Sequence, residues 1–311
     1  MTSPRLLRDR PVLTAVGGAL CIAFSAIFVR YADASPSTAA FFRCAYALPA
    51  LASLAIIERR GRKRSARERK MAFAAGGLFA ADLIFWHHSI DAVGAGLATV
   101  LGNTQVVFVG LLALLFLREK PPPRALLAIP IVLVGIVLIS GVLEADAYGD
   151  DPRLGAFFGI LTALCYSGFI LVLRHGSPDA RRPAGPLLDA TLSAAVISAL
   201  AGLALGDLHL AIGSAAHGWL IVLALTSQIL GWLLITMTLP QLPAATTSVI
   251  LTLQPVGSVL LGALLLTERP SPTQVAGVLL VLGTLIVVSR GAEGKVVPMG
   301  AAPTKAEEPV G

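Results

Sequence analysis

The sequence predicts an all-α polytopic membrane protein with ten transmembrane helices, arranged as two inverted five-helix repeats. Three observations lead to this class: long apolar blocks, basic residues confined to alternate connections, and an internal repeat. Of the 311 residues, 56% are hydrophobic and only 14% are charged. A soluble protein rarely has this balance, and blocks of about twenty apolar residues are long enough to cross a bilayer.

Apolar blocks, and the polar or proline-containing breaks between them, define the expected spans. Backbone amides in lipid need hydrogen-bond partners within their own segment, so each span is expected to be a helix. The ten expected helices cover residues 11–29, 37–57, 71–90, 93–117, 123–143, 154–174, 186–205, 215–238, 243–266 and 271–289.

These spans divide the chain into two repeats. The first is expected at 11–143 and the second at 154–289, joined by an acidic outward linker at 144–153. Residues 1–10 are expected to form a cytoplasmic N-terminus. The cytoplasmic tail at 290–311 is expected to be disordered, because it is rich in Gly, Pro, Ala and Glu and has no apolar periodicity.

Lysine and arginine follow the positive-inside rule in this topology. With the N-terminus inside, the cytoplasmic segments carry 20 basic residues and the outward loops carry three, Arg30, Arg153 and Arg269. The basic run at 58–70 is interpreted as a topology determinant rather than a lipid-head-group or nucleic-acid patch. The split predicts a multi-pass protein of the inner (plasma) membrane with both termini in the cytoplasm.

Other features of the sequence argue against nucleic-acid binding, a cleaved signal peptide, and disulfide or metal sites. The net charge of +6 does not indicate nucleic-acid binding, because the basic residues lie in short loops between apolar blocks. The stretch 11–29 follows a basic start, as in a signal peptide, but it is longer than an apolar core of about 7–15 residues. The three cysteines, Cys21, Cys44 and Cys165, lie inside expected spans and show no disulfide or metal-ligand spacing.

The internal repeat is the most informative pattern for function. Thr99–Lys120 is repeated as Ser248–Arg269, and Gln105 matches Gln254 at an offset of 149 residues. Five spans per half is an odd number, so the second half must enter the membrane from the opposite side. Inverted halves can exchange inward-open and outward-open shapes around a central site. Together with polar residues at mid-membrane, the repeat predicts a secondary transporter that works by alternating access.

The fourth helix of each repeat ends near a glutamate, Glu119 or Glu268, before a proline-containing turn and a glycine-bearing fifth helix (GIVLIS and GTLIVVS). In these features the chain resembles the EamA-type transporters of the drug/metabolite transporter superfamily over about residues 11–290. The resemblance implies a ten-helix transporter that usually exports metabolites, amino acids or toxic compounds. One departure is Val106, which stands where the second repeat has Pro255, since the family often has proline in both halves.

Ionisable and amide groups inside spans indicate functional sites, because a charge at mid-helix costs a few kcal/mol. Asp82 lies near the middle of the third span, and Trp86 follows on the same helical face. On a cavity-lining face, Asp82 would bind a cationic group or a coupling proton, and Trp86 would stack on the substrate. Alternatively, Asp82 packs between helices. Gln228 and Trp232 match these residues at an offset of 146, and for Gln228 the alternative is an interhelical hydrogen bond.

The fourth and ninth helices each carry two polar faces. One face holds Thr99 with Asn103 in the first repeat and Ser248 with Thr252 in the second. The other face holds Gln105 and Gln254, about 160–200° away. The sequence leaves open which set faces the cavity. Gln254 is preferred slightly, because the proline after it frees a carbonyl at the preceding turn.

The remaining charged residues have competing interpretations. Arg43 is the only basic residue well inside a span, and it is expected to recognise a substrate carboxylate or to act in gating, unless it reaches the interface. Asp189 falls near the corresponding place in the seventh helix. Glu119 and Glu268 are expected to be solvated charges that fix the turns after their helices. His87 is interpreted as an interface residue rather than a metal ligand.

These arguments give a substrate-binding set and no catalytic set. The expected substrate-binding residues are Asp82, Trp86, Asn103, Gln228, Trp232, Thr252, Gln254 and Arg43. The expected partners are a small-molecule substrate, the lipid bilayer and protons, with no metal, cofactor or nucleic acid; monomer and homodimer both stay open. Without a phosphate-binding loop motif, ion-driven export or passive exchange is expected instead of direct ATP drive.

Several alternatives to export stay open. An importer or an exchanger could share the same fold. A polytopic membrane enzyme or sensor is less favoured: an enzyme needs a cluster of His, Asp and Glu, and the nearest group, HHSID at 87–91, stands alone.

Overall fold

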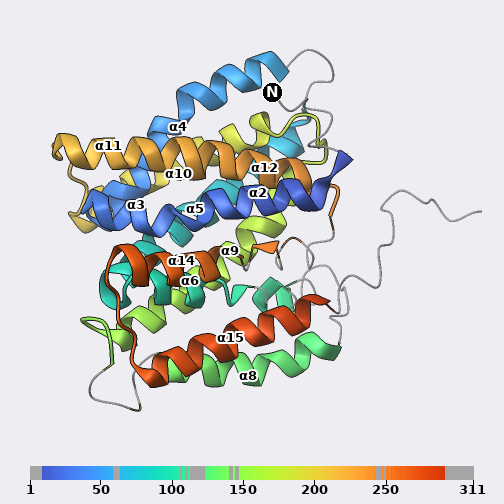
Figure 1. Cartoon of the computed structure of the whole chain (residues 1–311). Coiled ribbons are helices and arrows are strands. Elements are labelled where there is room, and N and C mark those ends of the chain that lie inside the picture. The colour runs from blue at the N-terminus through green and yellow to red at the C-terminus, as the bar shows by residue number, and fades with distance from the viewer. Residues whose placement is uncertain are drawn as a thin grey trace, which may run out of the picture.

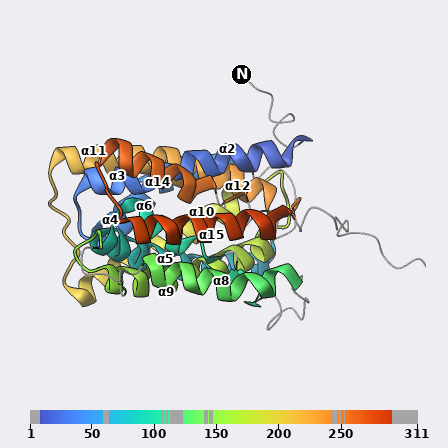
Figure 2. The same cartoon turned by 60° about the horizontal axis from the view of Figure 1, so that its bottom comes forward.

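The computed structural model describes residues 9–58, 64–105, 107–109, 111–112, 123–139, 143, 147–242, 247, 250–251 and 253–290. Within these ranges the secondary structure consists of helices and loops, without strands. The helices lie side by side along a common direction (Figures 1 and 2). This arrangement agrees with the predicted all-α class.

Each expected span contains at least one helix. The first half forms α2 (Pro11–Ala23), α3 (Ser25–Ala32), α4 (Pro36–Glu58), α5 (Ala66–Val93), α6 (Ala95–Gly102) and α8 (Pro123–Ile139). The second half forms α9 (Pro152–Gly176), α10 (Ala184–Leu205), α11 (Ser214–Leu223), the π-helix η1 (Ala224–Gly231), α12 (Trp232–Thr238), α14 (Leu253–Leu265) and α15 (Pro272–Arg290).

Several of these helices are suited to a bilayer. The segments that are long and apolar enough to cross a membrane are Pro11–Ala32, Pro36–Glu58, Pro152–Gly176, Ala184–Leu205 and Ser214–Thr238. Shorter apolar helices lie in the fourth, fifth, ninth and tenth expected spans. The chain is therefore a multi-pass membrane protein. The count of ten spans stays a prediction.

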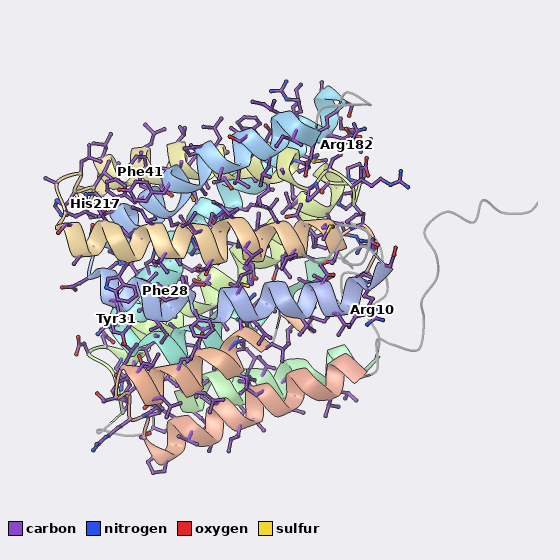
Figure 3. All side chains as sticks on the ribbon, turned by 45° about the horizontal axis from the view of Figure 1, so that its top comes forward. Arg10, Phe28, Tyr31, Phe41, Arg182 and His217 are labelled. Carbon is purple, nitrogen blue, oxygen red and sulfur yellow. The ribbon has the colours of Figure 1, made fainter. Side chains whose placement is uncertain are left out.

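The bundle has two distinct ends, which we name after one residue at each (Figure 3). Arg10 and Arg182 lie at one end, the Arg182 end. Tyr31 and His217 lie at the opposite end, the His217 end. Basic side chains mark the first end and aromatic ones the second, where Tyr31 packs on Trp219 with ring centroids 4.9 Å apart.

The third helix begins earlier than hydropathy predicts, and a capping box explains why. Ser65 Oγ accepts a hydrogen bond from the Glu68 amide at 3.1 Å. In return the Glu68 carboxylate accepts from the Ser65 amide at 2.8 Å. These bonds satisfy amides at the helix start that have no partner within the helix. The helix therefore starts at Ala66, five residues before the apolar block that was used to predict it at 71.

Helices α4 and α10 cap each other at both ends. The Glu58 carboxylate, at the end of α4, accepts from the amide of Ala184, the first residue of α10, at 3.0 Å. At the other end, Asp207 Oδ2, just after α10, accepts from the Ser37 amide near the start of α4 at 3.1 Å. Each carboxylate meets the positive end of a helix dipole. The pair is therefore antiparallel and fastened at both ends.

Candidate functional site

A cavity of about 50 Å³ lies among helices of both halves. Among the described residues, those that line it are Ile22, Ser25, Arg43, Phe79, Asp82, Leu83, Trp86, Thr99, Gly102, Asn103, Thr162, Tyr166, Trp232 and Gln254. The first half supplies them from α2, α3, α4, α5 and α6, and the second half from α9, α12 and α14. A volume of this size has room for a few water molecules.

Two opposite charges face this cavity. Arg43 is 2% exposed and Asp82 is 6% exposed, so both are almost fully buried. The two charges attract each other, yet none of the ion pairs within the described residues joins them. Arg43 Nε has no hydrogen-bond partner in the described part of the chain, although its guanidinium lies 5.8 Å from the centre of the Phe79 ring. Groups of this kind are available to a polar ligand.

Helix α6 presents its Thr99 and Asn103 face to the cavity. Thr99 Oγ1 donates to the Ala95 carbonyl at 2.8 Å, and Asn103 Nδ2 donates to the Thr99 carbonyl at 2.9 Å. Asn103 Oδ1 is buried without a partner among the described residues. Gln105 is also buried but does not line the cavity. In the first half, the polar face that the sequence left open is thus the one with Thr99 and Asn103.

In the second half, the polar face that carries Gln254 contributes to the cavity. Gln254, on α14, lines the cavity and donates from Nε2 to the Tyr166 hydroxyl at 3.4 Å. Thr252 lies outside the described residues. Gln254 and its repeat partner Gln105 therefore occupy different environments, so this pair differs between the halves.

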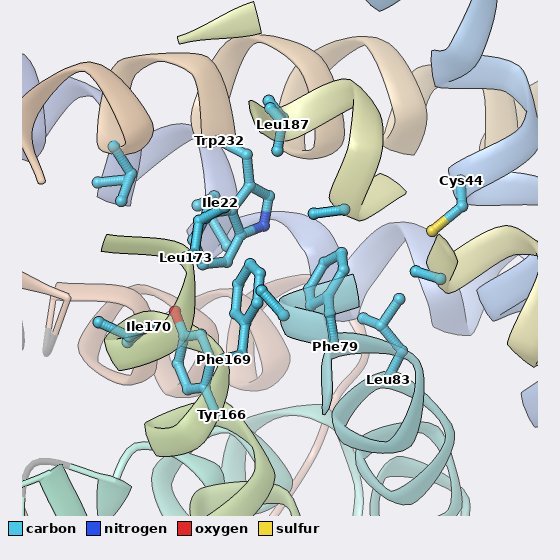
Figure 4. Packing of buried hydrophobic residues seen from close by; sticks show 14 of the residues in the cluster. Ile22, Cys44, Phe79, Leu83, Tyr166, Phe169, Ile170, Leu173, Leu187 and Trp232 are labelled. Atoms are coloured by element: carbon cyan, nitrogen blue, oxygen red, sulfur yellow. The ribbon is translucent and has the colours of Figure 1, made fainter. Parts of the chain in front are cut away.

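Aromatic rings form one wall of the cavity. Trp232 packs edge-on against Phe79 and Phe169, with ring centroids 5.5 and 4.8 Å apart, and Tyr166 lies nearby (Figure 4). Trp86 lines the cavity from α5. Sequence reasoning missed Tyr166. The repeat could have indicated it, because Cys21 and Cys165 match at an offset of 144, which pairs Tyr166 with Ile22, another lining residue.

Two of the proposed polar residues lie elsewhere. Gln228 is fully buried, does not line the cavity, and donates from Nε2 to Thr191 Oγ1 on α10 at 3.1 Å. This is the interhelical hydrogen bond of the alternative interpretation. Asp189, the suggested counterpart of Arg43, forms an ion pair with Arg64 at 2.7 Å. Asp189 therefore holds the connection between α4 and α5 against α10, and it does not face the cavity.

Two further sequence interpretations meet different outcomes. His87 is 2% exposed, with Nδ1 3.1 Å from the Pro36 carbonyl, so it is buried within the protein, and its depth in the membrane stays a prediction. Glu268 is 6% exposed, so its expected solvated position is wrong. Its repeat partner Glu119 lies outside the described residues.

The placement of the two glutamines gives a testable difference. If the cavity binds a transported solute, as the sequence predicts, Gln254→Leu is expected to raise the KM for transport about tenfold, because the cavity loses a polar group. Gln228→Leu removes an interhelical hydrogen bond and is expected to leave KM unchanged. Initial rates in proteoliposomes over a range of substrate concentrations measure both values. Equal effects of the two substitutions would contradict this placement.

Comparison with known proteins identifies the family. The sequence matches the EamA-like transporter family over residues 10–141 and 153–290. The chain belongs to this family. The EamA resemblance predicted from the sequence is confirmed, and the chain is a membrane transporter of the drug/metabolite transporter superfamily. Its family implies a small-molecule substrate and a lipid surrounding.

The fold of this EamA-type transporter is also seen in a solved structure. A protein whose title reads only "Crystal structure of protein" is 15% identical, with a TM-score of 0.66. The match covers 93% of this chain and 100% of the other. This likeness shows the fold alone. No curated protein matches the chain.

Proposed function

We propose that this EamA-type transporter exports a small organic solute across the inner membrane by alternating access. The observation that carries the proposal is the cavity, where Arg43 and Asp82 lie buried among side chains from both halves. The cavity of about 50 Å³ is small compared with ligand pockets of roughly 300–1,000 Å³. Separation of the helices would enlarge it for the substrate, as alternating access implies.

The reciprocal caps of α4 and α10 support an inverted repeat. Glu58 ends α4 and Asp207 lies just after α10, so the two carboxylates hold similar places in their helices. Each carboxylate caps the start of the other helix, at opposite ends of the bundle. A two-fold axis in the membrane plane would relate two such helices. We propose repeats at 11–143 and 154–289 about this axis, with the linker 144–153 between them and the tail 290–311 following.

The charge distribution supports the orientation. Arg10 and Arg182 lie at the Arg182 end (Figure 3), where Arg64 also pairs with Asp189. Short loops rich in arginine face the cytoplasm in inner-membrane proteins. We therefore place the Arg182 end, and both termini, in the cytoplasm, and the His217 end on the outward side.

The lining favours a particular class of solute. Arg43 offers a cation for an acidic group, and Asp82 offers an anion for an amine. The rings of Trp86, Trp232 and Tyr166 offer contact with apolar or cationic groups. These features fit an organic compound with both polar and apolar parts, such as an amino acid or an amine-containing drug-like compound. They do not fit a bare inorganic ion, which would need a ring of converging ligands.

Asp82 is the site that we propose for a coupling proton. The test is reconstitution into liposomes with a panel of amino acids, cationic drugs and other metabolites, with and without a pH gradient. The wild type is expected to move a member of the panel faster when the gradient is present, and Asp82→Asn is expected to lose this acceleration. Gradient-driven flux that is equal in the two proteins would rule out Asp82 as the proton site. The direction of net flux separates export from import or exchange.

A further inference from the structure

We propose that Glu268 is a positioning residue that holds the transport cavity closed at the His217 end. In this role it joins the start of α6 to the end of α14, and its release allows the His217 end to open. The end of α14 lies there, because the hydroxyl of Tyr31 donates to the Leu265 carbonyl at 3.4 Å. The inference rests on the proposed function, because a closing residue has a role only in a protein that opens. It adds a residue outside the cavity to the transport machinery.

The geometry of Glu268 is that of a helix cap between the two halves. Its carboxylate accepts hydrogen bonds from the amides of Ala95 at 2.6 Å and Gly96 at 3.0 Å. These are the first two residues of α6, whose amides have no partner within the helix and carry the positive end of its dipole. Glu268 itself follows α14 closely, and its amide donates to the Gly262 carbonyl at 3.1 Å. One side chain therefore joins the fourth and ninth expected spans.

Glycines create the space that this carboxylate occupies. A Cβ atom at Gly262 would lie 2.4 Å from Glu268 Oε2, and one at Gly96 would lie 3.1 Å from the same oxygen. Gly94 has φ +85°, and a Cβ there would lie 2.9 Å from Glu268 Oε1. Three positions without side chains thus surround the carboxylate, so the close approach of α6 and α14 depends on them.

Helix α6 connects the hydrogen bonds of Glu268 to the cavity. The carboxylate binds the amide of Ala95, whose carbonyl accepts from Thr99 Oγ1. The carbonyl of Thr99 in turn accepts from Asn103 Nδ2. Thr99 and Asn103 both line the cavity. Movement of the α6 start away from Glu268 would therefore carry these two side chains with it, which couples opening at the His217 end to the shape of the site.

The α4–α10 pair provides a contrast at the same end of the bundle. Asp207 caps α4 there, but Glu58 caps α10 at the opposite end, so this pair is tied at both ends. Loss of the Asp207 cap alone leaves the second tie in place. We therefore assign opening at the His217 end to the α6–α14 pair, with α4 and α10 moving as a unit.

Thiol labelling of one cavity position tests this assignment. The probe is Thr162→Cys, a buried lining residue on α9, in a chain whose three cysteines are replaced by serine or alanine. The protein is reconstituted in proteoliposomes of known orientation, and a membrane-impermeant maleimide is added from the side that the His217 end faces. Glu268→Gln is expected to raise the labelling rate about tenfold, because a neutral acceptor binds the two amides about half as strongly. Asp207→Asn is the matched control and is expected to leave the rate unchanged.

A second variant keeps the test decisive if Glu268→Gln folds poorly. Gly262→Ala places a methyl group against the carboxylate while the charge stays, and it is expected to raise the labelling rate in the same direction. The inference is overturned if neither variant accelerates labelling, or if Asp207→Asn accelerates it equally. The labelling rate needs no known substrate, so this outcome is separate from the proposed function, which fails instead if no solute in the liposome panel is moved.

Discussion

Replacing Arg43 with glutamine is expected to lower the transport rate about 100-fold and to destabilise the protein by about 2–3 kcal/mol. The reason is burial: Arg43 is 2% exposed, and its removal leaves the buried Asp82 carboxylate without its opposite charge. Asp82→Asn removes the buried carboxylate that attracts the guanidinium, and is expected to have a similar cost. The double variant removes both charges, so it is expected to regain most of the stability but not the transport.

Thermal unfolding in detergent, with flux measured in liposomes, gives the full double-mutant cycle. Arg64→Gln is the matched control, because Arg64 pairs with Asp189 at the Arg182 end and its loss is expected to cost about 1 kcal/mol. The account would be contradicted if Arg43→Gln were no more destabilising than Arg64→Gln. It would equally be contradicted if the double variant were less stable than either single variant.

Gly76→Ala is expected to cost about 3 kcal/mol or more, and to prevent accumulation of folded protein in the membrane. A Cβ atom at Gly76 would lie 2.2 Å from the Ala190 carbonyl oxygen and 2.5 Å from Ser193 Cβ. The α10 backbone cannot move aside as a flexible side chain would, so the added methyl group would force α5 and α10 apart. Because α5 carries Asp82 and Trp86, the cavity would also be distorted.

The neighbouring glycine provides the control for this prediction. A Cβ atom at Gly77 would meet only the tip of the Ile197 side chain, at 3.3 Å. Gly77→Ala is therefore expected to be neutral or slightly stabilising, since alanine favours a helix by about 0.5–1 kcal/mol. Size-exclusion profiles of detergent-extracted protein, compared at equal expression time, measure both variants. Similar profiles for the two would refute the tight α5–α10 contact.

Much of the fold could be predicted from hydropathy and charge, because the bilayer imposes span length and backbone pairing on every segment. The span predicted at 186–205, for example, is α10 at Ala184–Leu205. Hydropathy could not predict the helix ends. The start of α5 depends on the Ser65–Glu68 capping box, and the ties at Glu58 and Asp207 depend on polar contacts between distant segments.

The sequence predicted site residues where a charged side chain inside a membrane span would cost free energy. Asp82 and Arg43 drew attention for this reason, and both line the cavity. Gln228 was placed with Trp232 by assuming α-helical spacing. The segment Ala224–Gly231 is instead a π-helix, in which hydrogen bonds span five residues, so that spacing no longer places two side chains on one face.

Glu268 shows a different limit of sequence reasoning. At a helix end beside Arg269, a carboxylate is normally solvated, and the sequence alone supports that interpretation. Its burial depends on Gly96 and Gly262, which come from helices far apart in the sequence and leave room only when those helices meet. Tertiary contacts of this kind do not appear in hydropathy or in helical periodicity.

Access to the cavity from each side of the membrane tests the central claim most directly. In the cysteine-replaced chain, Thr162→Cys is exposed to a membrane-impermeant thiol reagent, added separately to the two faces of oriented proteoliposomes. If a chamber shared by both halves opens alternately, the reagent modifies this cysteine from either face, and a transported solute slows both reactions. A cysteine that reacts from one face only, or from neither, under every condition would contradict alternating access.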